Sequence, residues 1–188
     1  MTSRDLSLIA LFAALTAVCA QLSVALPLMT SVPFTLQVFA VLAAGAVLGA
    51  RRGALSQVVY LLLGTVGIPV FARMSGGLQI LMGPTGGYLW SFPLAGAVVG
   101  WAADRAFARG GRNTLYLYGG ILAGIAVIYA VGVAGLIASG AVHTLRRGLQ
   151  IGVVPFLWFD LLKGYLAGVV SVRVRSAVPG EPRQAPLA

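Results

Sequence analysis

The segment LWFDLLKGYLAG, residues 157–168, places two ionisable side chains, Asp160 and Lys163, inside an otherwise apolar run. Ionisable side chains are costly inside a membrane and usually face a bundle interior or a water-filled cavity. Residues three positions apart lie on the same face of a helix, so the carboxylate and the ammonium group can share one site. Two interpretations are open: an ion pair that only stabilises helix packing, or a site for a small polar ligand.

The composition places the chain among helical membrane proteins. Hydrophobic residues make up 59% of its 188 residues and charged residues only 9%, whereas soluble domains carry roughly 25% charged residues. Several apolar runs reach the ~20 residues that a helix needs to cross a lipid bilayer. The formal net charge of +9 does not indicate nucleic-acid binding, because the basic residues are scattered at the ends of apolar runs and form no stripe.

Breaks in the apolar pattern predict an all-α, polytopic membrane protein, folded as a compact bundle of six transmembrane helices. The breaks fall at PLMTSVP, ARRGA, RMSGGLQILMGPTG, ARGGRN and HTLRRG. The predicted spans are residues 6–26, 33–50, 54–72, 87–108, 115–139 and 149–172. Alternate connections must lie on the same side of the membrane. The side that also holds both termini then carries nine arginines, and the other side carries three. Because basic residues concentrate on the cytoplasmic side, both termini are expected in the cytoplasm.

We expect one membrane domain, residues 1–175, and a cytoplasmic tail. The tail, residues 176–188, is rich in proline and predicted to be disordered. The first span also resembles a signal peptide, since Arg4 precedes an apolar stretch that ends in VCA before Gln21. Cleavage would leave five spans and move one terminus outside, against the charge distribution. Cys19 is the only cysteine, which excludes an intrachain disulfide, and we expect it as a small apolar side chain on a packed helix.

Small residues recur at four-residue spacing along the predicted spans. The glycine pairs are Gly45/Gly49, Gly96/Gly100, Gly120/Gly124 and Gly164/Gly168. The first span carries alanine stripes instead, Ala10/Ala14 and Ala13/Ala17. Small residues let helices approach closely in lipid, so the glycines predict a compact bundle. For the alanines two interpretations are open: packing inside the bundle, or a smooth face that docks on another membrane protein.

Polar groups outside the last span are few. The segment GGLQILMGPTGGY, residues 76–88, suits either a folded-in loop at a ligand site or a tight turn that enters a helix. In the first case Gly86 and Gly87 would let the backbone approach a ligand, and Tyr88 would offer an aromatic face with a hydroxyl group. Gln37, at one end of the second span, either bonds across helices or lines a pocket.

Catalytic and metal-binding patterns are lacking in the sequence. The only histidine, His143, lies in a predicted outer loop, and no Cys/His/carboxylate cluster has the spacing of a metal site. No nucleotide-binding motif is present, because the GPTGG glycines are not followed by the Lys and Ser/Thr of a P-loop. We therefore expect neither an enzyme nor a cofactor, and no hydrolysis of ATP by the chain itself.

Four motifs occur together in order: VPFTLQ, RRGALSQ, GPTGGY and DLLK. In this combination, from about Pro33 to Lys163, the chain resembles the biotin transporter BioY family, the substrate-binding S components of energy-coupling-factor transporters. The resemblance implies a six-helix bundle in the bacterial cytoplasmic membrane, with a biotin pocket open to the outside. It also implies two kinds of partner, a transmembrane T component and paired ATPase subunits that power release inwards. The alanine stripes of the first span would then contact the T component.

The resemblance also implies a set of ligand-binding residues. They are Asp160, Lys163, Tyr88, Gly86, Gly87, Thr85, Gln37 and Ser75. One departure from the family pattern affects the neighbouring loop, where Arg73 and Met74 replace the small residues expected before SGG.

The chemistry of biotin fits these residues. Its cyclic urea offers two N–H donors and a carbonyl acceptor, and its valerate tail ends in a carboxylate. Asp160 can accept a urea N–H, while Lys163 can serve either the urea oxygen or, in the opposite pose, the tail. Tyr88, Trp90 and Phe34 are expected to form the wall around the apolar ring. The alternative is a solitary ion- or proton-coupled carrier with Asp160 as the proton site. A purely structural subunit is a further interpretation, which requires that Asp160 and Lys163 pair only with each other.

Overall fold

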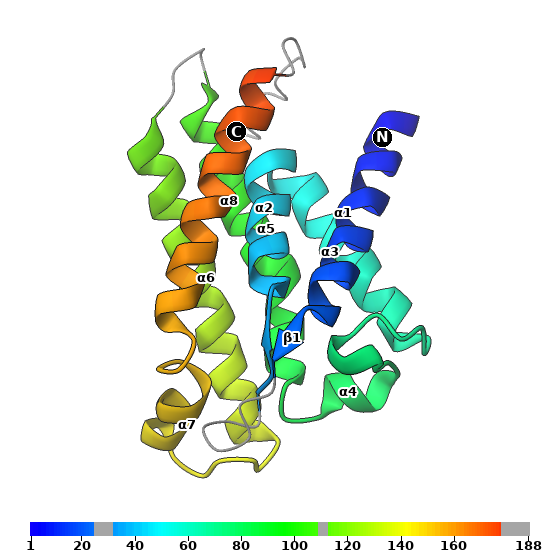
Figure 1. The fold of residues 1–188 in the computed structure, drawn as a ribbon, viewed down its shortest axis with the longest axis vertical. Coiled ribbons are helices and arrows are strands. Elements are labelled where there is room, and N and C mark those ends of the chain that lie inside the picture. The colour runs from blue at the N-terminus through cyan, green and yellow to red at the C-terminus, as the bar shows by residue number, and fades with distance from the viewer. Residues whose placement is uncertain (25–31, 109–112, 178–188) are drawn as a thin grey trace.

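A computed structural model describes residues 1–24, 32–108 and 113–177 as a helical bundle (Figure 1). The helices are α1 (Ser3–Gln21), α2 (Gln37–Leu48), α3 (Ala50–Thr65), α4 (Leu78–Met82), α5 (Gly86–Ala106), α6 (Thr114–Ala138), α7 (Leu145–Gly152) and α8 (Leu157–Ala177). A 3₁₀ turn, η1, covers Ala72–Met74, and two short antiparallel strands, β1 (Ser23–Val24) and β2 (Phe34–Thr35), pair with each other. The all-α prediction is confirmed.

Each predicted span overlaps a helix, but the count of six membrane crossings stays a prediction. Among the described residues, α1 and α6 are long and apolar enough to cross a bilayer, and α7 with α8 forms a third candidate if the bent pair is one span. The third predicted span, 54–72, extends too far, because α3 ends at Thr65. Most of the PLMTSVP and ARGGRN breaks, and residues 25–26 of the first span, lie outside the described residues.

The predicted span 149–172 is interrupted in the structure. Residues 145–177 form two helices, α7 and α8, with a bend of 57° between them. The break follows from Pro155, which lacks an N–H group and whose ring clashes with the carbonyl four residues earlier. Helix α7 also begins inside the predicted HTLRRG break, at Leu145, because the Thr144 hydroxyl accepts the Arg147 N–H and caps the helix.

Glycines at helix crossings confirm the predicted close packing. A Cβ atom at Gly45 would lie 2.5 Å from the Gly96 carbonyl oxygen, and a Cβ at Gly96 would lie 3.2 Å from the Gly53 oxygen. Helix α5 therefore packs closely on α2 and α3. The predicted break at ARRGA, residues 50–54, is displaced: the chain turns at Gly49, where φ is +84°, and residues 50–54 are helical.

Both ends of the described chain lie at the same end of the bundle, at the top of Figure 1. Helices α4 and α7 and strand β1 lie at the opposite end. Helix α8 continues through Ala177, so the first two residues of the predicted disordered tail are helical. Residues 178–188 of that tail are outside the described part of the structure. Cys19 is buried with a free thiol, as expected.

Candidate functional site

A cavity of about 230 Å³ lies toward the end of the bundle opposite the termini. Its walls come from six segments: the residues before and at the start of α2, the η1 turn, helix α4, the start of α5, the middle of α6 and the α7–α8 junction with the start of α8. Known ligand pockets range from ~300 to 1,000 Å³, so this cavity suits a small ligand. It contains the acid and the base that the sequence singled out.

The Asp160–Lys163 ion pair forms as predicted and faces this cavity. Lys163 Nζ lies 2.7 Å from Asp160 Oδ1, and the two residues are only 6% and 3% exposed. The α7–α8 break puts Asp160 in the first turn of α8, where the helix dipole stabilises a negative charge. Because both groups line the cavity, the pair is placed where a ligand can reach it.

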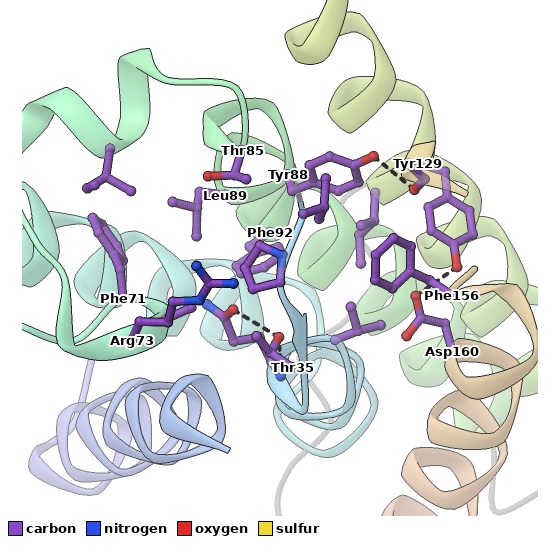
Figure 2. Close-up of a pocket in the computed structure, with 18 of the residues that line it drawn as sticks. Thr35, Phe71, Arg73, Thr85, Tyr88, Leu89, Phe92, Tyr129, Phe156 and Asp160 are labelled. Atoms are coloured by element: carbon purple, nitrogen blue, oxygen red, sulfur yellow. Dashed lines mark hydrogen bonds between the residues drawn. The ribbon is translucent and has the colours of Figure 1, made fainter. Parts of the chain in front are cut away.

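Three further groups surround the pair. The Tyr129 hydroxyl donates to Asp160 Oδ2 at 2.7 Å (Figure 2), and Lys163 Nζ donates to the Thr35 carbonyl oxygen at 2.7 Å. Lys163 Nζ also lies 4.2 Å from the centre of the Phe34 ring. A carboxylate accepts about four hydrogen bonds and an ammonium donates three. Asp160 and Lys163 thus retain capacity for a ligand beyond these bonds.

Gln37 has both of the roles that the sequence left open: it bonds across helices and it lines the cavity. Its side-chain nitrogen donates to the Tyr60 hydroxyl on α3 at 2.7 Å, and its oxygen accepts the Thr35 hydroxyl at 3.0 Å. Tyr60 in turn donates to the Val70 carbonyl oxygen at 3.2 Å. Gln37 also lines the cavity. This network joins the start of α2 to the segment that leads into η1.

Three predicted ligand residues between η1 and the first turn of α5 contribute to the cavity. Ser75, Thr85 and Tyr88 line it, and the Tyr88 hydroxyl donates to the Gly152 carbonyl oxygen at 2.9 Å. The predicted folded-in loop consists of the short helix α4 and a turn that enters α5.

Gly86 and Gly87 do not line the cavity. A Cβ atom at Gly87 would lie 2.6 Å from the Val131 carbonyl oxygen, and one at Gly86 would lie 2.5 Å from the Leu81 carbonyl carbon. Both glycines therefore serve the close packing of α5 against α4 and α6. The structure brings the other six predicted ligand residues together at the cavity.

The apolar wall differs from the expected one. Trp90 is 51% exposed and donates its indole N–H to the Leu81 carbonyl oxygen at 3.2 Å, outside the cavity. Phe34 is also absent from the wall and packs on Phe156, with 6.1 Å between ring centroids. Of the expected wall residues Tyr88 does line the cavity, and the apolar side chains beside it are those of Phe71, Leu89, Phe92, Ile128 and Phe156. Periodicity alone does not decide which face of a helix meets a cavity.

Sequence reasoning missed Tyr129 and left Arg73 without a role, although both line the cavity. One signal for Tyr129 exists in the sequence: it interrupts the apolar run GIAVIYAVGVAG, and a buried tyrosine hydroxyl needs a hydrogen-bond partner. For Arg73 the signal is its departure from the small residues expected before SGG.

The alanine stripes of α1 divide between two environments. Ala13 is buried in the core at 2% exposure and Ala17 is half-buried, whereas Ala10 and Ala14 are exposed. The sequence-based docking surface therefore reduces to Ala10 and Ala14. Their neighbours Leu6, Leu11 and Val18 on the same helix are also exposed and apolar.

Comparisons with known proteins agree with the membrane fold. The model of the BioY family matches residues 1–180. The biotin transporter BioY of Thermotoga maritima is 42% identical, over 92% of this chain and 96% of that protein. The probable biotin transporter BioY of Pyrococcus horikoshii is 41% identical, over 93% and 98%. A crystal structure of the S-component for biotin from an ECF-type ABC transporter superposes with a TM-score of 0.84 and 25% identity, covering 94% of this chain and 95% of that one.

Proposed function

The chain belongs to the BioY family, and from this premise we propose that it is a biotin-binding S component that mediates biotin uptake across the cytoplasmic membrane. The observation that carries the proposal is the buried Asp160–Lys163 pair on the wall of a small, otherwise largely apolar cavity. Isolated ions at such a position would be costly, and a ligand that bonds to both offsets part of that cost.

The polar groups of the cavity match the cyclic urea of biotin. The Asp160 carboxylate, already bonded to Tyr129 and Lys163, accepts a urea N–H. The third N–H of Lys163 donates to the urea oxygen, since its other two donors are used by Asp160 and Thr35. The apolar wall, including Phe92 and Phe156, covers the thioether ring. Biotin thus satisfies polar and apolar surfaces of the cavity together.

Transport requires energy, and the sequence contains no nucleotide-binding motif through which this chain could obtain it. We therefore assign release of biotin to a complex with a transmembrane T component and ATPase subunits. The exposed small residues Ala10 and Ala14 on α1 are the proposed contact with the T component, because helices in lipid associate through close approach at small side chains. Binding itself needs no ATP, metal or partner.

Equilibrium dialysis of the purified protein with labelled biotin tests this function. We expect saturable retention at submicromolar biotin, abolished by excess unlabelled biotin and unaffected by excess lipoate, which has a valerate tail but no urea. Addition of ATP or a chelator should change nothing. Absence of retention at micromolar biotin would refute the proposed function.

A further inference from the structure

Arg73 occupies an unusual backbone conformation at the edge of the cavity. Its φ and ψ are 60° and 39°, and the next residue, Met74, has a φ of 54°. Residues other than glycine adopt this left-handed region infrequently, because the Cβ atom crowds the backbone. Two such residues in succession persist only where surrounding contacts hold the turn. Strained turns of this kind cluster at functional sites.

Two sets of hydrogen bonds hold this turn. Phe71 and Ser75 form a small antiparallel bridge, with N···O distances of 2.9 and 3.3 Å. The Gln21 side chain, at the end of α1, donates to the Phe71 carbonyl oxygen at 3.1 Å and accepts the Met74 N–H at 2.9 Å. The turn is thus fixed from both sides, and the position of Arg73 is set by the fold.

The Arg73 side chain is directed into the cavity from the side opposite Asp160 (Figure 2). Within the described part of the chain, its guanidinium makes no hydrogen bond or ion pair. In contrast, Arg52 pairs with Asp5 and Arg175 with Asp104, each at 3.0 Å. A guanidinium without a partner beside a cavity is available to an anionic ligand.

The charges that line the cavity do not balance. Among its described lining residues, the charged ones are Arg73, Asp160 and Lys163. Asp160 and Lys163 neutralise each other, so Arg73 leaves a net charge of +1. Arg73 is exposed, whereas Asp160 and Lys163 are buried. The cavity therefore has a buried end at Asp160 and Lys163 without net charge and an exposed cationic end at Arg73, with Phe92 between them (Figure 2).

We propose that Arg73 is a specificity-determining residue that binds the carboxylate of the ligand. The inference rests on the proposed function and fixes the pose of biotin: the urea lies at Asp160 and Lys163, and the valerate tail extends past Phe92 to Arg73. The planar guanidinium can hold a carboxylate with two parallel hydrogen bonds. Arg73 thereby makes the cavity selective for acids over neutral esters and amides of the same shape.

Binding of biotin and of its neutral methyl ester to wild type and to Arg73→Met tests the proposal. The substitution removes the charge and keeps an unbranched side chain. We expect Arg73→Met to weaken biotin binding about tenfold to a hundredfold and to leave ester binding within about threefold, on the order of a lost packing contact. Arg146→Met is the matched control, because Arg146 is exposed on α7 outside the cavity, and it should change neither affinity.

Arg73→Lys keeps the positive charge and should retain part of the preference for biotin over the ester. Elution in gel filtration and the thermal midpoint first establish that each variant is folded. Unchanged biotin affinity in Arg73→Met, or an equal loss for biotin and ester in a folded variant, would overturn the proposal. Failure of the wild-type protein to bind biotin would refute the proposed function instead, and the pose with it.

Discussion

At the scale of single residues, the site depends on how Asp160 is satisfied. Its two oxygens are held by Lys163 and Tyr129 at 2.7 Å each. The sequence predicts the first partner, because both residues lie on one turn of one helix. It does not predict the second, since Tyr129 lies 31 residues away and reaches Asp160 only through the packing of α6 on α8. Short-range pairs can be inferred from spacing, whereas long-range partners depend on the tertiary fold.

Asp160→Asn should weaken biotin binding by about tenfold to a hundredfold, because a charge-assisted hydrogen bond contributes about 1.5–3 kcal/mol. The amide also leaves Lys163 buried without its counter-ion. The matched control is Asp104→Asn, whose carboxylate is half-exposed and pairs with Arg175 near the other end of the bundle. Equilibrium dialysis on both variants checks this expectation. Equal biotin affinities of the two variants would show that Asp160 does not bind the ligand.

At the scale of elements, the α7–α8 break is the feature that most shapes the site. The sequence predicts an apolar span there, but hydropathy averages over Pro155 and gives no bend. The bend of 57° starts a new helix at Leu157, and it brings Gly152 and Phe156 to the cavity beside Asp160. The break between α2 and α3 is displaced for a different, long-range reason: Asp104, far away in sequence, accepts the Ala50 N–H at 3.0 Å and favours a helix start there.

Gln21 links helix α1 to the turn that carries Arg73. Its amide contacts the backbone of Val70, Phe71 and Met74 at 2.9–3.3 Å. Gln21→Leu removes these bonds while keeping the size of the side chain, so the strained turn should relax and Arg73 should be less well positioned. We expect a loss of biotin affinity of about three- to tenfold, the scale of one or two neutral hydrogen bonds.

The methyl ester of biotin separates positioning from a general structural effect. Because the ester has no charge to meet Arg73, its affinity for Gln21→Leu should stay within about twofold, on the scale of a neutral surface change. Gln150→Leu is the control, since Gln150 is an exposed glutamine on α7. A parallel loss of ester and biotin affinity would contradict a positioning role for Gln21.

At the scale of the whole molecule, the proposed docking residues on α1 are separate from the residues that line the cavity. The cavity lies toward the end that carries α4 and α7, while both ends of the described chain lie at the other (Figure 1). With the predicted cytoplasmic termini, the cavity would face outward. The helical class and the approximate places of the longer helices were predictable because apolar runs and glycine spacing are local signals. The face that each helix turns toward the cavity or the core was not predictable. Trp90, which lies outside the cavity, and Ala13, which is buried in the core, illustrate this.

Docking on the T component should be separable from biotin binding by a substitution on α1. Ala14 is exposed at the side of the bundle, whereas Ala13 is 2% exposed and packs in the core. A tryptophan at Ala14 would hold a partner helix several ångströms away and remove the close contacts that drive helix association in lipid. Ala14→Trp should therefore abolish co-purification with tagged T component and ATPase subunits.

The same Ala14→Trp protein should bind biotin with unchanged affinity, because no residue of α1 lines the cavity. Leu122→Trp is the control, since Leu122 is 52% exposed on α6, and it should keep both binding and assembly. Both assays are run on one preparation, so a folding defect would appear as a loss of biotin binding. If Ala14→Trp retained its partners, α1 would not be the docking helix. If it lost biotin but kept its partners, α1 would act on the cavity, through Gln21 or directly, and the two functions would not be separate.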